Sequence, residues 1–179
     1  MNVKLPLRMK SFFVIIVFFI HLNSFGQTYY TGIGVRAGKF NTGITFKHFF
    51  DADNTTAIQL DLYYSNVASG GYTLKGFYIR QLPFRLPIVQ LPLDFVYGGG
   101  VQIGYFPFHP QGYYKRDEKD ADYYDSAVIS AGVGVTAQIE YRIRRTPITL
   151  GVEVVPFYEL INPGPEYVDF GVALRYVFR

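Results

Sequence analysis

The sequence AVISAGVGVTAQIEY, residues Ala127–Tyr141, alternates between two kinds of side chain. Apolar residues occupy its odd positions, whereas the even positions hold glycine, serine, threonine, glutamine, glutamate and a single valine. Because successive side chains of a β-strand point to opposite faces of a sheet, this stretch predicts a strand with one apolar face and one small or polar face. Residues 168–178 (VDFGVALRYVF) repeat the pattern near the end of the sequence.

The same alternation recurs along the chain after residue 26, and turn residues such as Asn, Asp, Gly and Pro interrupt it. No segment there has the period of an amphipathic helix. The register of the fourth expected strand stays open. Phe77 and Ile79 favour one face, whereas Leu74 and Tyr78 favour the other. The role of the Leu-Pro-rich connection at 82–92 stays open as well. The expected strands cover residues 29–40, 42–50, 55–64, 72–83, 91–105, 126–143, 147–158 and 166–178.

Residues 1–26 have the features of an export signal. Lys4, Arg8 and Lys10 form a positive segment, and the apolar run FFVIIVFFI follows at 12–20. This run is too short for a membrane-spanning helix, which needs about 20 apolar residues. Small residues at positions 24 and 26 predict cleavage after Gly26. We therefore expect a signal peptide at 1–26 and a single domain at 27–179.

The charge and cysteine counts exclude several classes of protein. The chain has 17 basic residues, 14 acidic residues and no cysteine. Removing the three basic residues of the export signal leaves 14 of each sign, so no positive excess favours nucleic acid as a partner. Without cysteine, a disulfide framework, a thiol enzyme and a cysteine-based zinc site are impossible.

Alternation alone leaves open whether the apolar face contacts lipid or encloses an apolar ligand in a soluble barrel. Glycines on the other face favour lipid contact, because glycine weakens a strand that faces water but fits the narrow lumen of an eight-stranded barrel. Tyr and Phe also cluster near the expected strand ends, as in the aromatic girdles of membrane barrels. We therefore expect an all-β fold, an eight-stranded antiparallel up-and-down transmembrane β-barrel. The glycines are Gly32, Gly34, Gly38, Gly98, Gly100, Gly104, Gly132 and Gly134.

The chain resembles the small outer-membrane β-barrels of Gram-negative bacteria, of the OmpA-membrane-domain and OmpX type. The segments GIGVRAGKFNTGITFKHFF (32–50) and YGGGVQIGYF (97–106) carry this resemblance, in a build related to the PorT-like barrels. The last strand is similar to the signal that the barrel-assembly machinery recognises, although Arg179 follows its final aromatic residue. The resemblance implies an outer-membrane location after cleavage near Gly26, and the assembly machinery as a partner during biogenesis, but no single activity. The signal residues are Gly171, Leu174, Tyr176 and Phe178.

Few residues after the export signal offer catalytic chemistry. Of the histidines only His48 and His109 remain, and neither has a serine or carboxylate at a spacing that indicates a triad. Asp51 and Asp53 flank a tight turn, where aspartate is common. We therefore expect no enzymatic activity, no cofactor and no metal. The alternatives are an outer-membrane enzyme that modifies lipid or cleaves protein and, less favoured, a soluble barrel that carries an apolar ligand.

The longest connection, residues 106–125, is expected outside the cell, because an even number of strands places both termini in the periplasm. Paired tyrosines bracket its charged tip. The connection is either a surface that contacts an unknown extracellular or periplasmic partner or a solvated extension of a hairpin. The tyrosines are Tyr113, Tyr114, Tyr123 and Tyr124.

Charged residues of both signs share the small-residue face and are expected to point into the lumen. Because an isolated buried charge is costly, the two signs should pair. Counting from the strand ends places Arg36 near Asp169, and Arg175 near Glu140 with Glu153 slightly above. This network predicts a closed lumen and a monomeric structural or surface-interaction protein embedded in outer-membrane lipid, rather than a porin. The expected lumen charges are Arg36, Lys47, Asp61, Asp94, Glu140, Glu153, Asp169 and Arg175.

Overall fold

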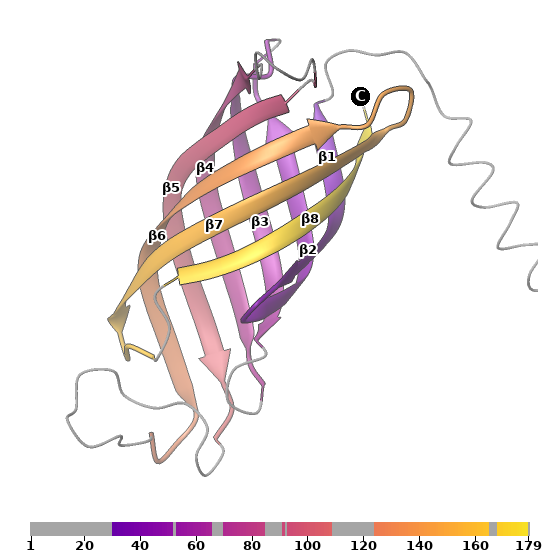
Figure 1. Cartoon of the computed structure of the whole chain (residues 1–179). Helices are drawn as coiled ribbons and strands as arrows, with labels where there is room; N and C mark the ends of the chain where they lie inside the picture. Colours follow the sequence, from indigo (N-terminus) through magenta and orange to yellow (C-terminus); the bar gives the residue numbers. More distant parts are fainter. Residues whose placement is uncertain are drawn as a thin grey trace, which may run out of the picture.

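The computed structural model describes residues 30–51, 53–65, 70–84, 91, 93–108, 124–164 and 168–178. Eight antiparallel strands, each paired with its neighbours in the sequence, form a closed barrel in which β1 pairs with β8 (Figure 1). This confirms the all-β class and the eight-stranded antiparallel barrel. The strands are β1 (Thr31–Gly38), β2 (Asn41–Phe49), β3 (Thr56–Ser65), β4 (Tyr72–Phe84), β5 (Leu93–Phe106), β6 (Val128–Arg142), β7 (Ile148–Ile161) and β8 (Val168–Phe178).

The observed strands coincide with the expected ones to within a few residues. The largest difference is in β7, which continues to Ile161 rather than 158, and its register against β6 shifts between Ala131 and Gly132. An irregularity of this kind inserts a residue into one strand and breaks the strict alternation on which the expectation rested. In β4 the open register is now settled: Phe77 and Ile79 are buried, and Tyr78 is exposed. The expected export signal at 1–26 lies outside the described residues.

The two faces of the barrel wall differ in polarity. In β6 the apolar side chains of Ile129, Val133, Val135 and Ile139 are exposed on the outer face, and the alternate polar side chains are buried in the lumen. On the other strands most outward side chains are likewise apolar or aromatic, so these side chains cover most of the outside. Among the exposed residues are Ile33, Val35, Ile44, Leu60, Leu62, Tyr64, Tyr72, Leu74, Tyr78, Tyr97, Val101, Ile103, Tyr105, Val152, Tyr158, Phe170, Val172 and Leu174.

Several inward glycines lie where the backbone of the next strand leaves no room for a side chain. A Cβ on Gly34 would lie 1.9 Å from the Leu174 carbonyl oxygen of β8, and a Cβ on Gly43 would lie 2.1 Å from that of Leu62. From the sequence, the inward glycines are explained by the limited space inside a narrow lumen. The structure adds a more local reason for glycine, because the backbones of neighbouring strands come into close contact at these positions.

The lumen is filled by apolar as well as polar side chains. The polar lumen expected from the sequence therefore describes only part of the interior. Two apolar clusters lie inside the barrel. The smaller cluster comprises Phe106, Val128 and the half-buried Tyr124. The larger cluster consists of Phe49, Ala57, Phe77, Ile79, Val96, Val155 and Val177.

No described part of the chain forms a helix of the length and apolar character needed to cross a membrane.

Candidate functional site: a ladder of buried charges

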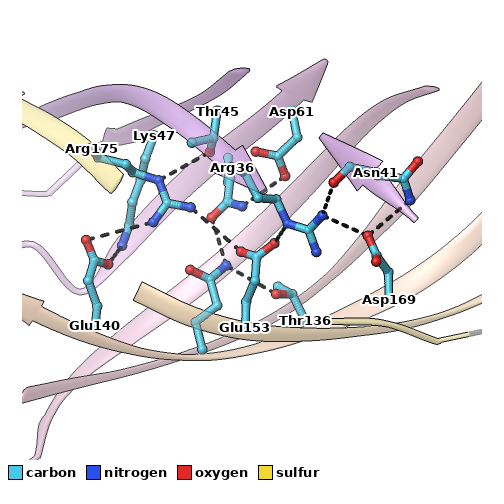
Figure 2. A network of polar contacts seen from close by, with 12 residues as sticks. Arg36, Asn41, Thr45, Lys47, Asp61, Thr136, Glu140, Glu153, Asp169 and Arg175 are labelled. Atoms are coloured by element: carbon cyan, nitrogen blue, oxygen red, sulfur yellow. Dashed lines mark hydrogen bonds and ion pairs between the residues drawn. The ribbon is translucent and has the colours of Figure 1, made fainter. Parts of the chain in front are cut away.

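Arg36 is the centre of the first group of buried charges. Its guanidinium forms an ion pair with Glu153 of β7, and its Nη1 donates to Asp169 Oδ2 of β8 at 2.7 Å (Figure 2). The same nitrogen donates to the backbone carbonyl of Asn41 at 3.0 Å. Gly171 makes room for this guanidinium, since a Cβ there would lie 2.6 Å from Arg36 Cζ. The first group therefore joins strands that are far apart in the sequence.

Arg175 and Lys47 share the carboxylate of Glu140 in a second group (Figure 2). Lys47 Nζ donates to Glu140 Oε2 at 2.6 Å, and Arg175 Nη1 lies 4.0 Å from Glu140 Oε1. Arg175 Nε also donates to the Thr45 hydroxyl at 3.2 Å. The second group is connected to the first, because Arg175 Nη2 lies 3.8 Å from Glu153 Oε2.

The polar contacts continue to the rim of the barrel at which β6 and β8 end, which we call the C-terminal rim. Lys47 Nζ donates to Gln81 Oε1 at 2.7 Å, and Gln81 Nε2 donates to Asp94 Oδ2 at 3.0 Å. Asp94 lies 3.9 Å from Arg142, and both side chains are partly exposed. At the opposite rim, Asn41 Nδ2 donates to Asp169 Oδ2 at 3.0 Å. We call this continuous series, from Arg142 to Asn41, the charge ladder.

The structure brings together the partners that residue counting placed at similar heights. Arg36 contacts Asp169, and Arg175 lies near both Glu140 and Glu153. Asp61 and Asp94 lie at the margins of this network. Asp61 is buried and accepts a hydrogen bond from Gln59 Nε2 at 2.9 Å. Asp94 lies at the C-terminal rim, where its side chain is 21% exposed.

Lys75 is a buried cation that the sequence reasoning missed. Its side chain points inward from β4, opposite Asp61 of β3, and the residue is 1% exposed. The ammonium lies 4.6 Å from the centre of the Phe157 ring and 5.7 Å from that of Tyr63, so aromatic faces stabilise its charge. The alternation could have found Lys75, because it shares the face of Phe77 and Ile79, but the sequence did not settle the register of that strand.

The ladder provides fixed electrostatic contacts across the lumen. Each of its buried carboxylates contacts at least one cation, and the side chains of Arg36, Lys47 and Arg175 are fully buried. Losing one member would leave its partners as uncompensated buried charges, which is why such networks hold their members firmly. Among the described residues, no group of His, Asp or Glu side chains is arranged to hold a metal ion.

His48 lies on the outer face of β2, between Phe46 and Phe50. Its Nδ1 shares a hydrogen bond of 2.9 Å with the Thr31 hydroxyl, and its ring stacks on Phe46 and meets the edge of Phe50. Within the described ranges no carboxylate contacts this ring. His109, the other candidate, lies outside the described residues.

Asp51 has a structural role in the β2–β3 turn. Its carboxylate accepts hydrogen bonds from the Thr55 hydroxyl and from the backbone N–H groups of Thr55 and Thr56. These bonds, with that of the Thr55 hydroxyl contributing most, lower the pKa of Asp51 below its ordinary value. Asp53 is exposed in the same turn.

Three of the four loop tyrosines, Tyr113, Tyr114 and Tyr123, lie outside the described residues. Tyr124 packs against Phe106 and Val128, and its hydroxyl donates to the Pro163 carbonyl at 3.4 Å. This residue therefore joins the base of the long loop to the β7–β8 connection.

The residues of the expected assembly signal fall on both faces of β8. Leu174 and Phe178 are exposed on the outside, and Tyr176 is half-exposed. Gly171 points inward, where it leaves space for the Arg36 guanidinium. This glycine therefore has a packing function in the folded barrel that its place in a signal motif does not reveal.

Comparison of the chain with protein-family models, with curated proteins and with solved structures finds no match.

Proposed function

We propose that this chain is a small outer-membrane β-barrel of a Gram-negative bacterium that acts as a structural or surface-interaction protein without catalytic activity. The observation that carries the proposal is the polarity of the wall, which is apolar outside and charged inside. A protein in water has the reverse arrangement, since burial of apolar surface drives its folding. Lipid is the environment that suits an apolar exterior over a closed set of paired strands.

The lumen supports this proposal over the soluble alternative. A barrel that carries an apolar ligand needs an apolar cavity, whereas this lumen holds Arg36, Lys47, Glu140 and Arg175 in one connected network. The lumen of an eight-stranded barrel is only wide enough for side chains. The charge ladder therefore favours a closed plug over a water-filled channel.

The expected export signal at 1–26 and the aromatic last strand suit a protein delivered to the outer membrane and inserted by the barrel-assembly machinery. With both termini in the periplasm, the C-terminal rim faces the periplasm and the long β5–β6 connection faces the cell exterior. An extracellular or periplasmic partner would then contact the loops rather than the lumen. We propose a monomer, because every strand edge is already paired by closure of the barrel.

The first expected result concerns detergent resistance. A closed barrel has no unpaired edge in its wall, so it resists unfolding by SDS until it is heated. Unboiled and boiled samples of membrane-extracted protein should therefore migrate differently on an SDS gel. Recovery of the protein in the soluble periplasmic fraction, with no shift on heating, would contradict the membrane assignment.

The second expected result concerns conductance. Purified protein in a planar lipid bilayer should show no steady porin-like conductance, because the charge ladder and the apolar cluster fill the lumen. A porin of known conductance in the same bilayer serves as the control. A stable open channel with the folded protein would show that the ladder does not close the lumen, and a small pore would become the better description.

A further inference from the structure

Arg80 is a charged residue on the predominantly apolar outer wall. It belongs to β4, which ends four residues later at Phe84, and it lies opposite Thr56, the first residue of β3. Its side chain is exposed, and it forms no hydrogen bond or ion pair with the described residues. Every charge of the ladder, by contrast, has an internal partner. The Arg80 guanidinium thus faces outward near the C-terminal rim, and none of its five donors has a partner among the described residues.

Two tyrosines lie next to Arg80 on the outer face of the wall. Tyr97 of β5 lies directly opposite Arg80, and Tyr78 is two residues away along β4 on the same outer face. They are 39% and 61% exposed, so both rings stand out from the wall. Amphipathic rings of this kind favour the level at which lipid head groups meet the acyl chains.

Gly99 forms a gap in the wall between these rings. It faces outward opposite Tyr78, on β5, and is the diagonal neighbour of Arg80. Because the strands tilt by roughly 40° to the barrel axis, a diagonal neighbour on the next strand lies above Arg80 rather than beside it. The nearest atom to a Cβ on Gly99 would be the Gly134 carbonyl oxygen at 3.8 Å, so the fold has space for a side chain here.

The contrast with the inward glycines indicates why this position matters. At Gly34 and Gly43 a side chain would collide with the neighbouring backbone, so packing of the wall requires glycine. Packing imposes no such requirement on Gly99, and glycine weakens a strand interior relative to residues with side chains. Glycine therefore leaves the outer face without a side chain at this position, beside Tyr78 and Tyr97.

We infer that this surface, formed by Arg80, Tyr78, Tyr97 and Gly99, binds an anionic phospholipid of the leaflet at the C-terminal rim. The Arg80 guanidinium receives the phosphate, which it can contact through two parallel hydrogen bonds. One acyl chain passes between the two tyrosine rings and lies over Gly99. The inference rests on the proposed membrane location and adds to it a defined site and a lipid class.

The charge of Arg80 favours phospholipid over a second copy of the chain. Two copies meeting symmetrically through this wall would bring two Arg80 side chains together with no acid on the site to separate them. A phosphate instead supplies the missing negative charge. The position near the C-terminal rim selects the periplasmic leaflet in the proposed orientation, where phospholipid rather than an external glycolipid is the available anion.

The test uses native mass spectrometry of the protein refolded in nanodiscs of equal parts phosphatidylglycerol and phosphatidylcholine. The wild type should retain phosphatidylglycerol in excess over the bulk ratio. Arg80→Gln should lower this preference on the order of tenfold, as expected for loss of a charge-assisted contact. The matched control is Arg145→Gln, which removes an exposed positive charge from the β6–β7 turn at the same rim and should keep the preference.

A second pair of variants tests the gap at Gly99. Gly99→Leu should reduce the total lipid retained, because the new side chain occupies the space over which the acyl chain is proposed to lie. Ala37→Leu places the same side chain on the outer face of β1 and should leave retention unchanged. The heat-dependent gel shift reports folding of every variant in parallel.

The outcomes separate this inference from the proposed function. A folded, membrane-inserted wild type that retains the two lipids in the bulk ratio would refute the lipid site alone. The lipid site would also be refuted if Arg80→Gln dissociated a dimer while leaving lipid retention intact. A wild type that fails to insert into the nanodisc would instead refute the proposed membrane location.

Discussion

Replacing Arg175 by leucine is expected to lower the free energy of unfolding by about 3–5 kcal/mol, the usual cost of removing one partner from a buried ion pair. Arg175 lies between Glu140 at 4.0 Å and Glu153 at 3.8 Å, and its side chain is fully buried. The leucine would leave excess negative charge buried in the lumen. Urea unfolding in lipid vesicles, followed by the loss of the heat-modifiable form, measures the change.

A double substitution tests whether the loss comes from uncompensated charge. Adding Glu140→Gln to Arg175→Leu removes one of the two carboxylates that lost their cation, so part of the lost stability should return. Recovery should be incomplete, because Lys47 also depends on Glu140 for its ion pair and would keep only Gln81.

A surface variant provides the control for these measurements. Arg145→Leu removes a charge from an exposed turn and should change stability by less than about 0.5 kcal/mol. If Arg175→Leu proves no more harmful than Arg145→Leu, the ladder does not hold the barrel together.

Gly34→Ala is expected to destabilise the barrel by about 3 kcal/mol, at the upper end of the range for overpacking. The new Cβ would lie 1.9 Å from the Leu174 carbonyl oxygen and 2.6 Å from Arg175 Cα, and both are backbone atoms that cannot rotate away. The contact lies on the seam where β1 and β8 close the barrel. Strand separation at this seam would expose unpaired backbone groups to lipid in the proposed setting.

The matched control for the seam variant is Gly76→Ala on the outer face. Its Cβ would approach Leu60 Cδ2 at 3.5 Å, an ordinary van der Waals distance, so stability should be unchanged or slightly raised. The two variants add the same methyl group to two strands of one barrel. Equal behaviour in the unfolding assay would contradict the close backbone contact at Gly34.

The strand pattern was readable from the sequence because it depends on local order alone. In Ala127–Tyr141 the odd or even number of a residue predicts the face on which its side chain lies. The side chains of β6 are buried and exposed in this same alternation. Odd and even numbering is a poor guide to the face of a residue where a strand pair contains an extra residue. The register of β6 against β7 shifts between Ala131 and Gly132, and an extra residue of this kind reverses the faces that follow it in its own strand.

The buried charges of the lumen were predictable only in part, because the prediction again depends on knowing which face of a strand each residue occupies. Charges such as Arg36, Glu140 and Glu153 stand out on a face of small residues, so their inward direction follows from the sequence. Lys75 escaped notice because the sequence left the register of its strand open, so its inward direction did not follow from its position in the chain. In the structure its ammonium lies over the rings of Phe157 and Tyr63.

The sequence by itself determined eight alternating strands, an apolar and a polar face, and the set of charges that share the lumen, since each follows from the two-residue period of a strand. The tertiary structure decided which charges meet. Glu153 reaches both Arg36 and Arg175 because the strands tilt and stagger around the barrel, bringing side chains of β1, β7 and β8 to one height. It also decided which glycines are indispensable, because the crowding at Gly34 arises from the carbonyl of Leu174, at the far end of the chain, and only closure of the barrel places that carbonyl beside it.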